Sequence, residues 1–349
     1  DFDQVFKIIK ENIYLIEQKI NYIFKDVILI IDNFNYSFIN LSGFKKLNGS
    51  QILKENITYI LNSLKSNISK TENKKTIIHI FNSKYILDKR KIENLPIGLF
   101  GDFYAHELSF CLLNNNDYKN LENIFSKCNV KIKKVFSKSF IIGSYLSNIK
   151  ENSGTFFQIE INNNNSKIFY FEDDALKFEQ NFNFGSDLVK KDISKITSLK
   201  IVTVENIIKN IKLNEEISNE ELVEKNLFDN QDYRKIKKKL LHDIAAARIQ
   251  EILEVMIIKN INLISHDKKD KLVFLKITNK EHFNSFQNYY RSYLLKKDNL
   301  IVKFIENITT EDLTYNANKL VNFGWKKEAI PVAQNNKSLI ARFFDVLFG

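Results

Sequence analysis

The chain has 349 residues, of which 44% are hydrophobic and 27% charged, and its formal net charge is +10. This length favours two or more subdomains over one small core, and the apolar content suffices for a globular interior. The positive charge fits anionic partners such as acidic peptides or lipid headgroups, and a solvated basic surface explains it equally well. No apolar run approaches the roughly 18 residues that a bilayer span requires, so we expect any membrane contact to be superficial.

The cysteines, the histidines and the first residues place further limits on the protein. Cys111 and Cys128 lie in no CxxC or zinc-finger spacing, which predicts two free thiols. The five histidines are scattered without metal-ligand spacing, so we expect no metal site. Asp1 to Asp3 lack a basic signal-peptide region and an initiator methionine, and we expect the chain to begin inside a longer protein.

Apolar spacing predicts alternating helices and strands in the first part of the chain. Residues 4–24 predict an amphipathic helix and residues 26–32 a buried strand. Strands at 36–41, 76–81 and 85–87 and a helix at 51–69 complete a small α+β module over 26–112. Beyond a turn at 95–101 the pattern predicts a strand at 106–113, a helix at 117–127, a strand at 131–136 and a helix at 139–145.

The second part of the chain repeats this mixture without a fixed period. Strands are predicted at 156–161, 167–171 and 176–182, and four consecutive asparagines join the first two. They are followed by a helix at 185–193, an exposed acidic stretch at 214–229 and a long helix with a basic front at 231–260. A strand at 272–277 and a helix at 281–296 complete the pattern. Residues 326–337 are expected to be a polar linker. The class is α/β or α+β with at least three subdomains.

The last dozen residues, 338–349, predict an amphipathic helix that lies on a membrane surface. At about 100° per residue one face gathers the apolar side chains Leu339, Ile340, Phe343, Phe344, Val346, Leu347 and Phe348. At roughly 1.5 Å per residue the segment is about 18 Å long, too short to cross a bilayer. One tail should bind weakly, because ordering the segment offsets most of the apolar burial, whereas several tails on one polymer would bind together. Packing of the same face onto the protein's own core is the alternative.

Three internal stretches share their order and spacing with one known family. Pro96-Ile97-Gly98-Leu99-Phe100-Gly101 matches a DP(I/V)GM.G segment, and Ala247-Arg248-Ile249-Gln250-Glu251-Ile252 matches an EARxxEI helix. The run from Glu160 through the asparagines to Gly185 follows the spacing of a second phosphate loop. With these motifs and its apolar tail the chain resembles FtsA, the bacterial actin-like division protein, from beyond that family's first phosphate loop onward.

The resemblance implies an actin-like (ribonuclease H-like) α/β fold of two halves, with an inserted SHS2-type subdomain and a C-terminal amphipathic helix. It assigns 1–25 and 113–153 to subdomain 1A, 26–112 to the SHS2-type subdomain 1C, 154–200 and 269–325 to subdomain 2A, 201–268 to subdomain 2B, 326–337 to a linker and 338–349 to the membrane-targeting helix. It also implies a location on the cytoplasmic face of the inner membrane, at the division septum.

The family binds ATP between its two halves, and the resemblance implies a degenerate form of that site. The matching positions are Glu160, Asn162, Asn163, Asn164, Asn165, Ser166, Lys167, Gly185 and Thr278. Asparagines replace the glycine triplet, and their side chains occupy space that a phosphate would use. Lys167 replaces an aspartate and could neutralise a phosphate. We therefore expect no catalytic residue and no bound cofactor, with ATP and Mg²⁺ binding or weak ATPase activity left open for the full-length protein.

The resemblance also implies a surface for the acidic-hydrophobic C-terminal peptide of FtsZ. By matching spacing this surface includes Arg234, Arg248 and Glu251. The two arginines suit carboxylates of the peptide. Glu251 could fix Arg248 by an i,i+3 contact or meet a peptide lysine. A solvated basic face is the other explanation of these charges.

The expected function is therefore that of an adaptor that anchors FtsZ filaments to the membrane. The resemblance further implies self-association as an actin-like polymer and recruitment of later division proteins through subdomain 1C. The alternatives are an actin-type ATPase with nucleotide-dependent filaments and a PilM-like pilus adaptor, which would not require the apolar tail. Nucleic acid is not an expected partner, because the basic residues form no aromatic-interleaved stacking surface.

Overall fold

The computed structural model describes residues 2–148, 154–211, 217–228, 231–264, 271–296, 299–305 and 308–329. The predicted membrane-binding residues 338–349 lie outside this part of the chain, as does most of the predicted linker. The chain divides into two compact units. Unit 1 contains the described residues of Asp1–Thr155, Phe171–Glu179 and Ile308–Gly349, and unit 2 contains those of Phe156–Tyr170 and Gln180–Asn307.

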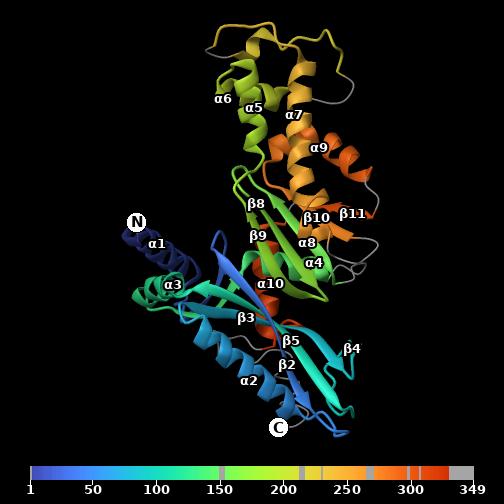
Figure 1. The fold of residues 1–349 in the computed structure, drawn as a ribbon. Coiled ribbons are helices and arrows are strands. Elements are labelled where there is room, and N and C mark those ends of the chain that lie inside the picture. Colours follow the sequence, from blue (N-terminus) through green and yellow to red (C-terminus); the bar gives the residue numbers. More distant parts are fainter. Residues whose placement is uncertain are drawn as a thin grey trace. The chain divides into compact units, whose positions relative to one another are not determined.

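Unit 1 contains an antiparallel sheet in the order β2-β5-β3-β4. Its strands are β2 (Tyr36–Lys46), β3 (Lys75–Leu87), β4 (Arg90–Ile92) and β5 (Phe103–Asn114). Helix α2 (Lys54–Thr71) lies along one face of the sheet (Figure 1) and buries an apolar stripe against it. Strand β3 has two register shifts but stays paired with β5 along its length. The strands predicted at 76–81 and 85–87 are therefore one strand.

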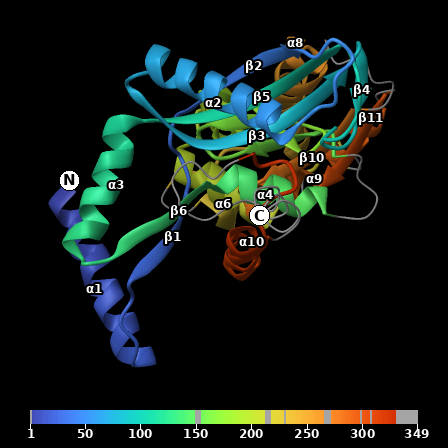
Figure 2. The ribbon, with the colours of Figure 1, turned by 90° about the horizontal axis from the view of Figure 1, so that it is seen from below.

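A second sheet of unit 1 joins β1 (Asp26–Ile31) in parallel to β6 (Lys131–Ser137). The prediction that the strand at 26–32 belongs to the module 26–112 was therefore wrong, because β1 pairs with β6 and not with a strand of the four-stranded sheet. A wholly apolar run without alternation is typical of a strand in a parallel sheet. The neighbouring helices are α1 (Phe2–Ile20), α3 (Asn115–Lys127) and α4 (Lys138–Ser147), which Figure 2 shows from below.

The segment 308–329 belongs to unit 1, although the predicted boundaries placed residues up to 325 in the second half. Its helix α10 (Thr310–Phe323) packs on α4, where Asn316 Nδ2 donates to the carbonyl oxygen of Ile141 over 2.9 Å. After the helix the chain runs beside β3, and Glu328 forms an antiparallel bridge with Phe81. This helix and the bridge were not predicted.

Unit 2 contains most of a sheet in the order β11-β10-β7-β8-β9, whose residues 171–179, in β8 and β9, are grouped with unit 1. The strands are β7 (Phe156–Ile161), β8 (Ser166–Glu172), β9 (Ala175–Phe182), β10 (Lys271–Ile277) and β11 (Leu300–Phe304). Strand β10 runs parallel to both β7 and β11. The links from β7 to β8 and from β8 to β9 are short hairpins, which connect antiparallel strands. Strand β7, the first strand of this sheet in the sequence, thus lies in its middle, which is the ribonuclease H-like arrangement that the resemblance to FtsA implies.

Unit 2 also contains helices. They are α5 (Asp187–Thr197), α6 (Ile201–Asn210), α7 (Lys238–Leu253) with a π-helical turn at Glu254–Ile258, α8 (Ile261–Ile264) and α9 (Lys280–Leu295), which packs on β11. The prediction of a helix over 231–260 was wrong for residues 231–237, because α7 begins only at Lys238. The amide of Val223 donates to Ile236 O and that of Lys238 to Glu221 O, which keeps the preceding backbone extended. Within the described residues, no helix is both long and apolar enough to cross a membrane.

Candidate functional site

The asparagine hairpin between β7 and β8 closes on itself. The amide of Asn162 donates to the carbonyl oxygen of Asn165 over 2.9 Å, and Asn162 Nδ2 donates to Asn165 Oδ1 over 2.8 Å. None of the four asparagines has a positive φ. The turn therefore needs neither glycine nor the left-handed region that asparagine tolerates. The next hairpin does use that region, at Asp173 and Asp174.

The first amides of α5 donate to this hairpin. Ser186 N donates to Asn162 O and Asp187 N donates to Asn163 O, both over 2.9 Å. Gly185 lies so close that a Cβ on it would overlap the two carbonyl groups. Free amides at a helix N-terminus are a ready site for phosphate. Here those amides have carbonyl partners, and the glycine serves the close approach of two backbone segments.

Two side chains after β10 hold the hairpin from another direction. Thr278 Oγ1 donates to Asn162 Oδ1 over 2.7 Å, and Asn279 Nδ2 donates to Asn163 Oδ1 over 3.3 Å. The structure thus brings Asn162, Asn163, Asn165, Gly185 and Thr278 together within unit 2. Asn279 completes this cluster and was missing from the predicted site. Its place directly after a strand parallel to β7 was the available signal, because the ends of neighbouring parallel strands meet at one edge of a sheet.

The remaining predicted positions lie around the hairpin. Glu160 accepts a hydrogen bond of 3.1 Å from Gln158 Nε2, and Ser166 donates to Phe184 O over 2.8 Å. Asn164 is exposed, whereas Lys167 is buried. No described group of three or more His, Cys, Asp and Glu side chains is arranged to hold a metal. Because the helix amides and two asparagine side chains are bound within the cluster, these residues do not fit a triphosphate.

Of the three residues predicted to bind the peptide, Arg248 and Glu251 lie together on α7, whereas Arg234 precedes the helix. Arg248 Nη1 donates to Glu251 Oε2 over 2.6 Å, the expected i,i+3 contact, and Arg248 Nε donates to Asp192 of α5. Arg234 lies ahead of the helix, is exposed, and makes no ion pair with any described residue. Lys237, Lys238 and Lys239 are paired with carboxylates, including Lys238 with Glu224 at 2.7 Å. Arg234 is therefore the free guanidinium of the predicted set.

Sequence reasoning missed a polar cavity of about 580 Å³ in unit 1. Its lining comes from three distant stretches, namely 83–95, 173–174 and 326–327. Lys91 pairs with Asp173, and Lys326 pairs with Asp174 at 2.5 Å. Lys327 has no ion pair with a described residue. Its Nζ lies 5.4 Å from the centre of the Tyr85 ring, and burial lowers its pKa.

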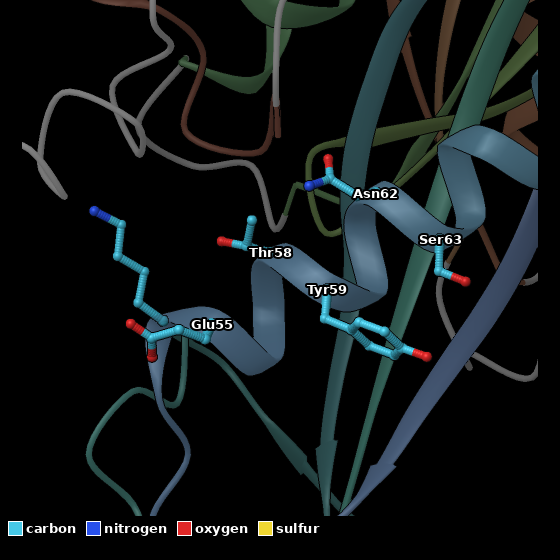
Figure 3. A pocket seen from close by; sticks show the side chains of 6 residues that line it. Glu55, Thr58, Tyr59, Asn62 and Ser63 are labelled. Carbon is cyan, nitrogen blue, oxygen red and sulfur yellow. The ribbon is translucent and has the colours of Figure 1, made fainter.

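A second hollow, of about 500 Å³, lies on the outer face of α2 (Figure 3). Successive turns of this one helix provide the lining side chains, which are Lys54, Glu55, Thr58, Tyr59, Asn62 and Ser63. They include a single acid and a single lysine. This hollow therefore contains no cluster of groups suited to catalysis.

Comparison with known proteins gives one curated relative and several solved structures. The cell division protein FtsA of Buchnera aphidicola subsp. Schizaphis graminum (strain Sg) is 23% identical over 260 residues, which are 73% of this chain and 61% of that protein. The chain thus spans less than two thirds of the relative's length. No protein-family model matches.

Among solved structures, the PilM-PilN type IV pilus biogenesis complex is similar at 8% identity and a TM-score of 0.47, over 91% of this chain and 82% of that chain. MreB 5 of Spiroplasma citri bound to AMPPNP is similar at 12% identity and a TM-score of 0.38, over 60% and 64% of the two chains. The resemblance to FtsA inferred from the motifs is confirmed by the curated relative. With its ribonuclease H-like sheet order, the chain is a divergent FtsA-like protein with an actin-like fold.

Proposed function

We propose that this chain is a cell-division adaptor that binds the C-terminal peptide of FtsZ and a membrane surface. The similarity to FtsA over 73% of the chain is the observation that carries this proposal. The proposed location is the cytoplasmic face of the inner membrane at the septum. The proposed membrane contact is residues 338–349, and self-association would let several weak tails bind one membrane together.

We further propose that the adaptor is not an enzyme and holds no cofactor. The hairpin Asn162–Asn165 supports this, since Ser186 N and Asp187 N donate to its carbonyl oxygens. A phosphate group would have to break both hydrogen bonds before it could reach the helix N-terminus. The alternative, a nucleotide-driven filament, requires these two hydrogen bonds to break and is therefore the less favoured function.

For the FtsZ peptide we assign different roles to the two arginines. Arg248 is held by Asp192 and Glu251, so it shapes the surface of α7 next to α5. Arg234 is exposed and has no described ion-pair partner, so its guanidinium is available to a carboxylate of the peptide. The lysines of the first turn of α7 would mainly raise the association rate.

The cavity of unit 1 supports the proposed recruitment of later division proteins. Three lysines converge there, and only Lys91 and Lys326 have described carboxylate partners. The ammonium of Lys327 is suited to an acidic side chain of a partner peptide. The apolar groups of Ile92 and Leu95 line the same cavity, which fits an acidic peptide with an apolar neighbour.

The peptide assignment is tested by fluorescence anisotropy with a labelled C-terminal peptide of FtsZ. Arg234→Glu should weaken binding about tenfold or more, because a charge-assisted hydrogen bond is replaced by repulsion. Lys319→Glu, on α10 of unit 1, is the matched control and should leave the affinity unchanged. Unchanged affinity of the Arg234 variant would remove this residue from the binding surface. Charge reversal at Arg248 should also weaken binding, through loss of its two contacts.

A further inference from the structure

One end of the four-stranded sheet of unit 1 exposes a group of large apolar side chains. We propose that this end, named here the tip surface, binds an anionic lipid surface directly and independently of the C-terminal segment. Its apolar members are Phe44, Leu53, Leu99, Phe100 and Phe103. Phe44 is 67% exposed and Phe100 is 70% exposed. Apolar side chains grouped on an exposed surface mark an interaction site more often than isolated ones do.

Two loops form the tip surface, and backbone hydrogen bonds tie them together. Leu47 N donates to Asp102 O over 2.8 Å, and Ile52 N donates to Leu99 O over 2.8 Å. In the opposite direction Gly98 N donates to Ile52 O over 2.9 Å. The loops therefore present Leu99 and Phe100 from a fixed backbone. Phe100 in particular leaves most of its apolar surface exposed to solvent.

The aromatic pair beside these loops lies on one face of the sheet. Phe44 and Phe103 stack with ring centres 5.4 Å apart and planes at 23°. A Cβ on Gly43 would meet Ile60 and Leu64 of α2, so Gly43 faces the helix. Successive side chains of a strand point to opposite faces, and Phe44 therefore faces away from α2. The stacked pair is thus outside the core that α2 covers.

Cations surround the apolar group. The turn between β3 and β4 has Asp88 and Lys89 at φ values of 49° and 68°, which suits a two-residue hairpin. Asp88 Oδ1 accepts the amides of Asp102 and Phe103 over 2.9 and 2.8 Å, and this fixes the turn to the tip surface. Lys89 and Arg90 are exposed there, and β2 adds the exposed Lys45 and Lys46.

The acidic groups of the tip surface do not cancel these cations. Its carboxylates are Asp88 and Asp102, and Asp88 already accepts two amides. The adjacent start of α2 adds Lys54 and Glu55, which balance each other. The excess of cations complements the negative potential of a bilayer that contains anionic lipids, where each basic residue near the surface strengthens binding.

The shape of the tip surface favours lipid over a folded protein as its partner. Side chains that project from loops need a groove in a protein partner, whereas a lipid interface admits them without one. Aromatic and leucine side chains enter the boundary of the acyl chains, and lysine and arginine keep their charges at the headgroups. Few side chains of the tip surface would enter the lipid, so this contact should be weak alone. It should orient a protein that also binds the membrane through another segment.

A tryptophan placed at the tip surface tests the proposal in the full chain. The natural Trp325 is buried and provides a constant background. Phe100→Trp places the reporter in the tip surface, and Tyr315→Trp, at an exposed site on α10 of unit 1, is the matched control. Each variant is mixed with vesicles of 70% phosphatidylcholine and 30% phosphatidylglycerol, with and without brominated acyl chains, and bound protein is measured by co-sedimentation.

The proposal predicts a blue shift and bromine quenching for the Trp at position 100, and neither change for the Trp at position 315. If the protein sediments with vesicles while the Trp at position 100 stays unshifted and unquenched, the tip surface does not touch lipid and the proposal is wrong. Absence of any sedimentation overturns it as well. Leu99→Asp with Phe100→Asp should weaken vesicle binding about tenfold, since two apolar groups are lost. Lys89→Glu with Arg90→Glu should weaken it only on vesicles that contain phosphatidylglycerol.

Discussion

Glu328 and Lys134 form an ion pair of 2.8 Å in the interior of unit 1. Both side chains are almost wholly inaccessible, and Glu328 Oε1 also lies 3.1 Å from Nδ1 of the buried His79. Glu328 follows α10 in sequence, whereas Lys134 lies on β6 and His79 on β3. These contacts, with Trp325 Nε1 donating to Asp174 O over 2.9 Å, fix the last described segment of the chain to unit 1.

Replacement of Glu328 by glutamine should destabilise unit 1 by about 3–5 kcal/mol, because Lys134 would remain buried without a counter-charge. Urea unfolding followed by circular dichroism measures the change. The double variant Lys134→Met, Glu328→Leu removes both charges and should cost less than Glu328→Gln alone. A double variant that is less stable than the single one would mean that the ion pair itself stabilises the fold.

Acid should destabilise the protein below about pH 6.5. Burial lowers the pKa of His106 and of His282 to about 3, and burial also lowers the pKa of His79. Each folded pKa lies below the unfolded value of 6.5, so the unfolded chain binds more protons as the pH falls. Stability should be complete above pH 6.5 and then fall by about 1.4 kcal/mol per pH unit for each histidine.

Urea midpoints at pH 7.5 and pH 5.5 test this expectation, and equal midpoints would contradict it. His282→Gln keeps a partner for the Tyr290 hydroxyl, which lies 2.9 Å from His282 Nε2, and it should reduce the pH dependence of unit 2. A separate loss of stability, from the ion pair of Glu328 with Lys134, should follow at lower pH. Burial alone raises the pKa of Glu328, but Lys134 and His79 outweigh it, so the pKa lies below 4.5 and the ion pair is lost only as the pH falls through that lower value.

Gly185→Ala should lower the free energy of unfolding by about 1–3 kcal/mol. The added methyl group would overlap the carbonyl groups of Asn162 and Asn163, and neither backbone segment can move without losing the hydrogen bonds to α5. Asn164→Ala, at an exposed position of the same hairpin, is the control and should change stability by less than about 0.5 kcal/mol. Equal stability of the two variants would show that α5 and the hairpin are not in close contact.

Calorimetric titration with Mg-ATP tests the closed hairpin in another way. The full chain should show no binding heat at millimolar nucleotide, because the amides of Ser186 and Asp187 already have carbonyl partners. Thr278→Val removes the hydrogen bond to Asn162 Oδ1 and should not create a site, since both helix amides remain occupied. Micromolar affinity in the unchanged chain would contradict the proposal that the nucleotide site is lost.

Several elements could be predicted because their signals are local. Strand β7 has its predicted bounds, β9 and β10 each begin one residue earlier than predicted, and β8 is one residue longer at each end. Apolar runs between turn residues determine such strands. The clustering of Asn162, Gly185 and Thr278 could also be predicted, since the resemblance places these positions around one nucleotide site.

Other features depend on long-range contacts that no local pattern contains. The apolar run of β1 gives no sign that its partner is β6, more than a hundred residues away. The helix at 231–260 looked continuous, but backbone hydrogen bonds from Val223 and Lys238 hold its predicted start extended. Lys327 occurs in a polar stretch of the sequence, and only the fold brings it to Tyr85.

The central claim is that one chain links FtsZ to a membrane, and a three-component sedimentation assay tests it most directly. FtsZ filaments are mixed with vesicles of 70% phosphatidylcholine and 30% phosphatidylglycerol, with and without the full chain. We predict that FtsZ sediments with the vesicles only when the chain is present, and that either deletion of 338–349 or Arg234→Glu strongly reduces this recruitment. FtsZ that stays in the supernatant although the chain itself binds the vesicles would contradict the adaptor function.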